Sequence, residues 1–366
     1  MTNSKVFEEL QWHKFHLGSH GFVTLVDIMG DDNAVVQAAR ISYNKSFADD
    51  KERFEDAAAK LFPGVQELSE DQIKQIKTKV EEDTEGLLRY LMRKRHTTPF
   101  EMAEVKLLIH CPMDVWRQWI RHRTASVNEY STRYTTAIDE AAHTNSDEWR
   151  VQSTDNKQGS KGYLDSWPEG VKAVKYVHQL ADRVEDRWMV VDAAGNKLAD
   201  FLFEPTPGHY LSQREAQILK DCRSVYDERQ KFGIANEQAR KDLPLSTYTE
   251  SYWKVDLHNL LHFLALRMDT HAQKEIREFA ACIGEQIIAP LFPKVWRAFV
   301  DYRLEGMALS RMDIVAIQTS HYYTLHPEDW ANYQGDLNTI FPGKRERQEC
   351  IAKLVRMRII PEGMFK

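Results

Sequence analysis

The sequence predicts a globular fold that mixes β-strands with long helices and contains no Rossmann unit. Residues 21–30 and 104–110 have the apolar and β-branched pattern of strands, whereas residues 257–268 repeat leucines at helical spacing. No G-x-G-x-x-G, P-loop or G-x-S-x-G motif occurs, so Rossmann, Walker and nucleophile-elbow sites lack support. The 366 residues are enough for one large domain or two ordinary ones.

Composition and charge narrow the class of protein. The chain is 42% hydrophobic and 28% charged, the mix of a soluble globular protein. No apolar run approaches the ~20 residues of a membrane span, and residues 1–10 lack an apolar signal region, so we expect neither a membrane partner nor secretion. The net charge of -6 makes nucleic acid a poor first expectation as a partner. The cysteines form no CxxC pair and favour a reducing cytoplasm; they are Cys111, Cys222, Cys282 and Cys350.

The first hundred residues are expected to alternate strand and helix. Residues 21–30 form a strand that ends in glycine, after which Asp31 or Asp32 caps a short helix over residues 34–41. Residues 45–86 are rich in charged and amide side chains, and we interpret them as surface helices and loops broken at Pro63-Gly64. A helix follows over residues 82–94.

The next stretch, His96 to Glu101, carries more specific information. Thr98-Pro99-Phe100-Glu101 has the pattern of a capping box, so a structural role explains Thr98 and Glu101 as well as a functional one does. His96 has no such structural explanation. A strand over residues 104–110 and a helix opened by Pro112 then lead to Arg121.

The second half of the chain is expected to be mostly helical. Polar residues 135–165 indicate a long loop or insertion, whereas valines and a leucine at 171, 174, 177, 180 and 184 predict one long helix. The remaining expected elements are a turn at 192–197, helices at 212–231 and 235–241, an extended stretch at 246–255, and a basic tail at 307–366. Asp256 is expected to cap the longest helix, which continues to residue 288 and places Arg267 and His271 on one face.

Residues 121–134 stand out because they cannot build a core. Ala125 and Val127 are their only aliphatic side chains, so the stretch is either solvated or gathered around a polar ligand. From Arg117 to Arg133 there are four arginines against one acid, Glu129. A cationic site in an acidic protein suggests a small anion more than a long polyanion.

Arginine is the strongest chemical signal, because it binds phosphate through two hydrogen bonds and stays charged at every working pH. Candidates come from three separate segments: Arg121, Arg123, Arg133, Arg240 and Arg267. Arg267 lies in an apolar helix, where an unpaired charge would cost several kcal/mol, so it needs an anionic partner.

Two other candidates have plainer explanations. His258 and His262 are one helical turn apart, which suits a metal pair, but Asn259 stands where a zinc protease motif has Glu. A polar pocket lining explains both histidines, and we expect no metal. Cys111 could be a nucleophile, but a lone Cys between a strand and a helix is usually a small core residue.

Taken together, these motifs resemble those of the flavin-dependent thymidylate synthases. Residues 121–133 meet the pattern R-H-R-x-x-S-x-N-x-x-S-x-R at every position. Residues 96–101 resemble the H-x-T/S-P-F-E box, residues 38–42 the A-A-R-x-S box, residues 266–273 the L-R-x-D-x-H-A-Q helix and residues 240–244 the R-x-x-L-P motif. The resemblance covers about residues 20–43, 84–135 and 232–305, in the family's order.

The resemblance implies an α+β fold and a reaction. The implied reaction is reductive methylation of dUMP to dTMP, with methylenetetrahydrofolate as carbon donor and NADPH as reductant through FAD. It implies a synthase domain over residues 1–305 with insertions at about 44–83 and 136–166, and a C-terminal extension over 306–366. It also implies a cytoplasmic homotetramer whose active sites are shared between subunits.

Site residues follow from the matched motifs. FAD is expected at Ser42, Thr98, Glu101, Arg121, His122, Arg123, Glu129, His258, His262 and His271. The nucleotide is expected at Gln118, Glu129, Ser131, Thr132, Arg133, Arg240 and Arg267. His258 and His262 depart from the Arg and Asn of other members, which weakens the positive charge offered to FAD.

The chemistry of the expected roles follows from the residue types. Arg267 is expected to stabilise negative charge on the uracil ring, and Arg133 with Ser131 to hold the phosphate. His96 either orients a ligand or moves a proton. Ser131 lacks an adjacent base and is treated as a binding residue rather than a nucleophile. The rival interpretation is a nucleotide- or nucleic-acid-binding protein that uses the Arg and Tyr side chains without turnover.

Overall fold

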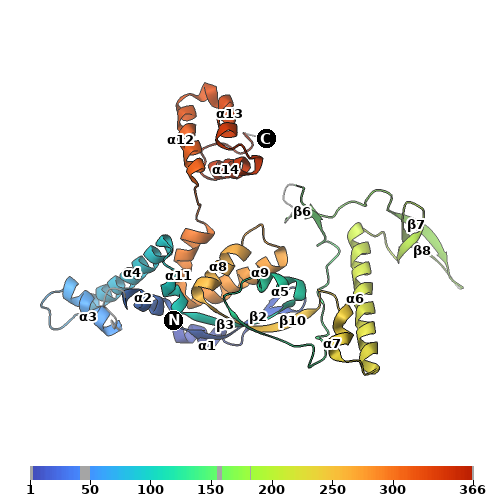
Figure 1. The fold of residues 1–366 in the computed structure, drawn as a ribbon, viewed down its shortest axis with the longest axis horizontal. Helices are drawn as coiled ribbons and strands as arrows, with labels where there is room; N and C mark the ends of the chain where they lie inside the picture. Colours follow the sequence, from blue (N-terminus) through green and yellow to red (C-terminus); the bar gives the residue numbers. More distant parts are fainter. Residues whose placement is uncertain (1–2, 42–49, 155–158, 182, 365–366) are drawn as a thin grey trace. The chain divides into compact units, whose positions relative to one another are not determined.

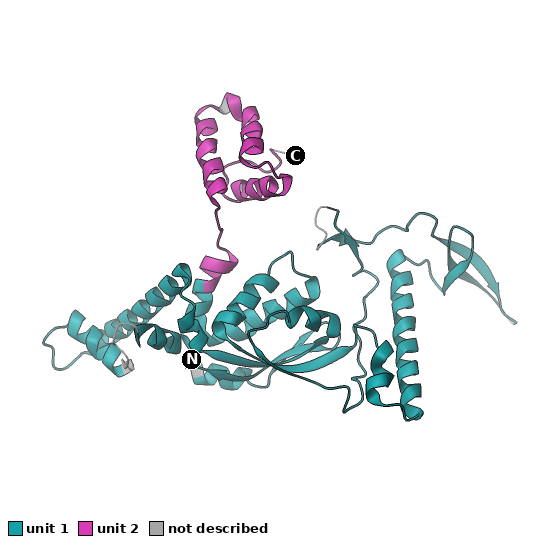
Figure 2. Cartoon of the chain, viewed as in Figure 1, with its two compact units in different colours: residues 1–298 teal, residues 299–366 magenta. Residues whose placement is uncertain are grey.

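The computed structural model describes residues 3–41, 50–154, 159–181 and 183–364. The chain divides into two compact units, Met1–Ala298 and Phe299–Lys366 (Figure 2). No helix among the described residues has both the length and the apolar character needed to cross a bilayer.

A five-stranded antiparallel sheet organises the first unit (Figure 1). Its order is β1 (Lys14–Leu17), β2 (Gly21–Met29), β3 (Glu104–Pro112), β10 (Tyr248–Asp256) and β4 (Ser126–Glu129). The three long strands confirm the strands expected at 21–30, 104–110 and 246–255. Strand β4 was not expected; it lies at one edge of the sheet, places part of the cationic stretch there, and pairs with β10 from Ser126 to Glu129.

Three helices pack beside this sheet and close its core. They are α5 (Met113–Trp119), α8 (Leu257–Arg267) and α9 (Lys274–Cys282). Trp119 on α5, Trp253 on β10 and Phe263 on α8 are fully buried, with ring centroids 4.8–5.4 Å apart. This aromatic cluster fixes the end of α5, from which the chain enters the Arg121 stretch.

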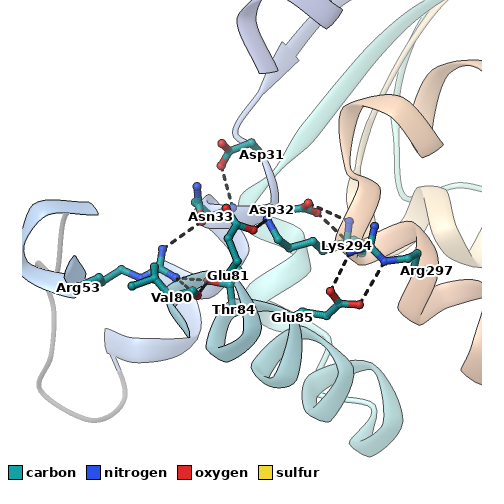
Figure 3. Close-up of polar contacts among 11 residues, drawn as sticks. Asp31, Asp32, Asn33, Arg53, Val80, Glu81, Thr84, Glu85, Lys294 and Arg297 are labelled. Atoms are coloured by element: carbon teal, nitrogen blue, oxygen red, sulfur yellow. Dashed lines mark hydrogen bonds and ion pairs between the residues drawn. The ribbon is translucent and has the colours of Figure 1, made fainter. Parts of the chain in front are cut away.

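Helices α2 (Asp32–Arg40), α3 (Asp50–Leu61) and α4 (Glu70–Lys94) are held together by polar contacts (Figure 3). Arg53 on α3 is only 5% exposed and donates hydrogen bonds to Asn33 on α2 and Thr84 on α4. The Asp32 carboxylate accepts hydrogen bonds from the backbone N–H groups of Lys294 and Val295, at 2.9 and 3.1 Å, in the first turn of α11 (Pro293–Phe299). Hydrogen bonds therefore join α3 to α2 and α4, and α2 to the start of α11.

Two local expectations for this region are wrong. Helix α4 begins at residue 70 rather than 82, because Ser69 and Gln72 form a complete capping box there. Thr98 does not open an α-helix: residues Thr98–Met102 form a 3₁₀ turn, and Thr97, at its N-cap, makes no side-chain cap bond. The exposed Thr98 and half-buried Glu101 are therefore not explained by capping.

The long helix expected over residues 171–184 is also wrong. The structure has a meander of β7 (Lys172–Gln179), β8 (Val184–Val191) and β9 (Lys197–Phe201), in which Gly195 makes the expected turn. Valines are β-branched and favour strands. The valines whose spacing of three suggested a buried helix face do not share a buried face, because Val177 and Val184 are each 63% exposed. Within residues 136–166, β5 (Arg150–Gln152) and β6 (Ser160–Tyr163) form a second hairpin.

The helix expected from Asp256 to residue 288 is interrupted. Asp256 caps α8 as expected, but α8 ends at Arg267, and α9 begins at Lys274 and runs into a π-helix, Ile283–Ile288. In the turn between them, the Asp269 carboxylate accepts a hydrogen bond from the backbone N–H of His271. Arg267 and His271 therefore do not share a helix face, and the longest helices are α4 and α6 (Pro207–Lys231), of 25 residues each.

The second unit is a small helical bundle. It contains α12 (Arg311–Leu325), α13 (Trp330–Ile340) and α14 (Lys344–Arg356). Eight buried residues form its core: Ala316, Tyr323, Tyr333, Leu337, Phe341, Cys350, Leu354 and Ile360. The tail predicted only as basic is thus folded, with a core of its own.

Candidate active site

A cationic cavity of about 410 Å³ opens where the Arg121 stretch meets α8. Among the residues that the structure describes, its wall contains three arginines and no carboxylate, and consists of Arg121, His122, Arg123, Thr124, Trp253, Val255, Asn259, His262, Leu266 and Arg267. Strand β10 supplies its floor through Trp253 and Val255, whose alternation places both on one face. The cavity therefore presents positive charge beside an apolar surface.

Arg267 makes two hydrogen bonds within the unit that forms this cavity. Its Nε donates a 3.0 Å hydrogen bond to Nε2 of His122, and an Nη donates to the backbone oxygen of Gln118 at 3.3 Å. Neither partner carries negative charge, and partial burial lowers the pKa of Arg267 from its ordinary value. The guanidinium is therefore held in place by neutral partners, which leaves its charge available to a ligand.

His122 is held in its neutral form. Burial is the largest cause that lowers its pKa to about 4, and the nearby Arg267 and His262 lower it further. The hydrogen bond from Arg267 requires a lone pair on Nε2, which fits a neutral imidazole. His122 also packs edge-on against the ring of Phe263, at 4.9 Å between centroids.

A row of amide and carboxyl groups supports Gln118. The Gln118 side-chain amide donates to Oε1 of Gln273 at 2.5 Å, and the Gln273 amide donates to Asp114 at 3.4 Å. Burial raises the pKa of Asp114. This row connects α5 to the start of α9. It therefore helps to hold Gln118, whose backbone oxygen accepts the hydrogen bond from Arg267.

A second group of expected site residues surrounds the end of the motif. Thr132 is buried and accepts a hydrogen bond from Arg240 at 2.5 Å. Arg133 is exposed and pairs with Glu237 at 3.3 Å, while its backbone N–H bonds the Ser131 hydroxyl at 3.4 Å. Glu129, at the end of β4, accepts a hydrogen bond from Thr249 at 2.9 Å. The structure thus joins this part of the motif to α7 (Asn236–Ala239) and the turn after it.

The other expected residues lie outside the wall of this cavity. Exposed His96 follows α4 and packs edge-on against Tyr90 at 5.5 Å, and Thr98 and Glu101 follow it on the 3₁₀ turn. His258 lies in the first turn of α8, and exposed His271 bonds Asp269 at 2.7 Å. Ser42 falls outside the described residues.

Cys111 is fully buried on β3, and burial raises its pKa well above the ordinary value. A thiol in that environment is a core residue and not a nucleophile. Sequence analysis missed Asp114, Trp253, Asn259 and Gln273, although Gln273 belongs to the same motif as Arg267. The strand alternation of β10 could have identified Trp253, whereas no sequence pattern marks Asp114.

Comparison with known proteins identifies the family. A family model described as "Thymidylate synthase complementing protein" matches residues 24–294. The flavin-dependent thymidylate synthase of Wolbachia pipientis wMel is 36% identical over 320 residues, which are 87% of each chain. The chain belongs to the flavin-dependent thymidylate synthase family. The enzyme of that name from Gluconobacter oxydans is 38% identical over 303 residues, 83% of this chain and 78% of the relative.

A solved structure also resembles this flavin-dependent thymidylate synthase fold. It is a UMP/dUMP methylase, PolB, from Streptomyces cacaoi bound with 5-Br dUMP, with a TM-score of 0.54 and 25% identity. The match covers 79% of this chain and 99% of that one. The expected α+β fold, the enzyme class of a dTMP-forming methyltransferase and the flavin cofactor are thereby confirmed.

The cavity fits the cofactor that the family requires. FAD carries two phosphates and a planar ring system, and this wall offers Arg121 and Arg123 for the former and an apolar floor at Trp253 for the latter. The absence of any carboxylate from the wall removes the main competitor for those guanidinium groups. His262 and His122 add imidazole nitrogens to the same wall.

Proposed function

We propose that the cationic cavity holds FAD next to dUMP, and that Arg267 serves the reacting ring. The observation that carries this proposal is the hydrogen bonding of Arg267 to neutral partners only, in a wall without carboxylates. Methylenetetrahydrofolate would supply the carbon and NADPH the reductant. When bound, FAD supplies the hydride chemistry that no side chain of this cavity can perform.

Arg267 activates the pyrimidine electrostatically in this proposal. Attack on the transferred carbon by carbon 5 of uracil requires negative charge to build up on the ring. A guanidinium fixed beforehand by His122 and Gln118 stabilises that charge without having to reorient. The buried Cys111 thiol is not needed.

Phosphate binding is assigned to the second group. Arg133 is exposed, and its guanidinium forms a surface ion pair with Glu237 at 3.3 Å. Surface ion pairs contribute little stability, so a dianionic phosphate can take the place of the Glu237 carboxylate. Arg240 donates a hydrogen bond to Thr132, the residue before Arg133, and the Ser131 hydroxyl offers a further hydrogen-bonding group. His96 would complete the site by orienting a ligand or by moving a proton.

We also propose that several copies of the chain assemble, as a homotetramer, to complete each site. The support is the separation of the expected residues into the cavity group, the Arg133 group and the His96 turn, which no described pocket unites. A reducing cytoplasm is the proposed compartment, in keeping with four free cysteines.

The test combines spectroscopy with isotope release. Purified protein is expected to be yellow, its flavin absorbance to bleach with NADPH and dUMP, and tritium to leave [5-³H]dUMP when methylenetetrahydrofolate is added. A protein that stays colourless after incubation with FAD would refute the assignment. Flavin and dUMP binding without tritium release would favour the rival, a nucleotide-binding protein without turnover.

A further inference from the structure

Residues 344–358 of the C-terminal unit carry a concentration of basic side chains that the proposed function does not use. Between Lys344 and Arg358 there are six basic residues and two acids, in a chain whose net charge is -6. The match to the family model ends at residue 294, before this unit begins. The unit has its own buried core, so its charges are displayed on a folded surface.

Among the described residues, two of these six basic side chains, Arg345 and Lys353, form ion pairs with acids of the unit. Lys353 pairs with the buried Asp313 at 2.6 Å and is therefore compensated. Arg347 and Arg356 instead donate to the backbone oxygens of Phe341 and Glu305, at 3.1 and 2.8 Å, and keep their full charge.

The remaining basic residues of this stretch face solvent. The Arg345 side chain is 88% exposed and pairs only with the exposed Glu349, at 3.1 Å. Lys344 and Arg358 are exposed as well. Gln348 and Ala352 lie between Arg345 and Arg356 on the same exposed side of the helix. The exposed residues of α14 thus include three basic side chains, Lys344, Arg345 and Arg356, two acidic ones, Glu346 and Glu349, and no large apolar side chain.

The connection into α14 has the form of a helix-turn-helix. Residues 341–343 join α13 to α14, with Phe341 buried in the core and Gly343 at the N-cap. Figure 1 shows α12 and α13 side by side and α14 lying across their ends. In helix-turn-helix modules a short glycine-containing turn precedes the helix that enters the major groove.

We propose that the C-terminal unit binds double-stranded DNA, with the exposed face of α14 in the major groove. The B-form major groove admits an α-helix, whereas the deep and narrow major groove of A-form RNA does not. Lys344, Arg356 and Arg358 would contact phosphates, and Arg345 and Gln348 would reach base edges. This binding is independent of dTMP formation.

The test measures binding of the full-length protein to a short fluorescent DNA duplex of mixed sequence, at several salt concentrations. The wild-type binding constant is expected to fall linearly with salt on logarithmic axes. Lys344→Ala/Arg345→Ala is expected to weaken binding and, because Lys344 contacts a phosphate, to reduce that slope by about one. Glu349→Gln removes an acid from the same face and is expected to tighten binding, a gain that misfolding cannot produce.

The matched control is Lys175→Ala/Arg183→Ala, which removes the same two charges from exposed positions around the β7–β8 hairpin. It is expected to bind as wild type does, and all three variants should form dTMP at the wild-type rate. The proposal fails if no salt-dependent DNA binding is seen, or if the control loses as much affinity as the α14 variant. Equal or tighter binding to duplex RNA or to phosphatidylserine vesicles would also overturn it.

Discussion

The Arg267 side chain lowers the stability of the free protein, and its position suits the binding of an anionic ligand. Its charge is partly buried at the end of an apolar helix, and its two hydrogen bonds go to neutral groups. Such a charge is destabilising until an anion arrives. The free energy of ligand binding therefore includes relief of an unfavourable charge that the protein already carries.

Arg267→Ala is expected to reduce dTMP formation by about 10²–10³-fold, the usual effect of removing one preorganised electrostatic donor. Flavin binding should be affected less, because Arg121 and Arg123 remain. Tritium release under saturating substrates provides the measurement. Arg297→Ala is the control, since Arg297 already pairs with Glu85 at 2.8 Å, and its activity should stay near wild type. Full activity in the Arg267 variant would contradict the proposed role.

His122 gives the site a dependence on pH. Its pKa is about 4 in the folded protein against an ordinary 6.5, so between these values the unfolded chain binds more protons than the folded one. Stability and flavin retention should therefore fall as the pH is lowered through this window, by roughly 1–2 kcal/mol after allowance for solvent screening. His122→Asn should flatten the profile of retained flavin absorbance against pH. An unchanged profile in that variant would rule out His122 as the cause.

Cys111→Ala is expected to leave dTMP formation intact. The thiol is fully buried and its pKa is raised by burial, so it supplies packing rather than nucleophilicity. Loss of its sulfur should cost about 1 kcal/mol of stability, measured by thermal unfolding. Loss of turnover by a variant that remains folded would require a cysteine-dependent mechanism instead.

At the scale of elements, the sequence predicted helix and strand ends that are set by residues close by in the chain. Asp256 was expected to cap α8 and does so, through a 2.9 Å bond from the backbone N–H of Asn259. Residues 171–184 were mistaken for a helix because valines at a spacing of three fit both periods over a short window. The break after Arg267 escaped prediction because Asp269 stabilises the turn through a side-chain bond, and no Pro or Gly marks it.

The β5 segment provides an element whose contribution can be measured. Arg150 pairs with Glu275, and Lys274 pairs with Glu148 at 3.2 Å, so this segment holds the first turn of α9 next to Gln273. Because the Gln273 side chain bonds that of Gln118, loss of these ion pairs is expected to alter the position of Arg267, which bonds the Gln118 backbone oxygen.

Arg150→Glu is accordingly expected to lower kcat several-fold, with a smaller effect on the KM for dUMP. The double variant Arg150→Glu/Glu275→Arg restores the attraction with reversed charges and should recover most of the loss. Steady-state kinetics of the three proteins measure this coupling. If the double variant is no better than Arg150→Glu, the ion pair does not transmit the effect.

For the whole molecule, the motifs name candidate site residues but do not predict which of them lie close together in one copy of the chain. Arg121, His122 and Arg123, which are expected at FAD, line one cavity with Arg267, which is expected at the nucleotide. Arg133 and His96 lie apart from that cavity, because the first is bound to α7 and the second follows α4. Spacing along a chain cannot reveal which residues a neighbouring copy would bring.

Shared sites can be tested by mixing inactive variants. Arg267→Ala and Arg133→Ala are each expected to be inactive alone. If the two residues of one site come from different copies, co-expression at equal levels should restore about one quarter of the wild-type sites. Tritium release by the purified mixed oligomer gives the result. A mixture as inactive as its components would place both residues in one copy.

The buried Arg53 limits how this chain can be shortened or recombined. Its guanidinium joins α3 to Asn33 on α2 and to Thr84 on α4, and α2 also supplies Asp32 to the start of α11. Excision of α3 would remove the hydrogen-bond donor that links the half-buried Asn33 to the buried Thr84. A chimera that exchanges this segment with a relative must therefore transplant positions 33, 53 and 84 as one unit.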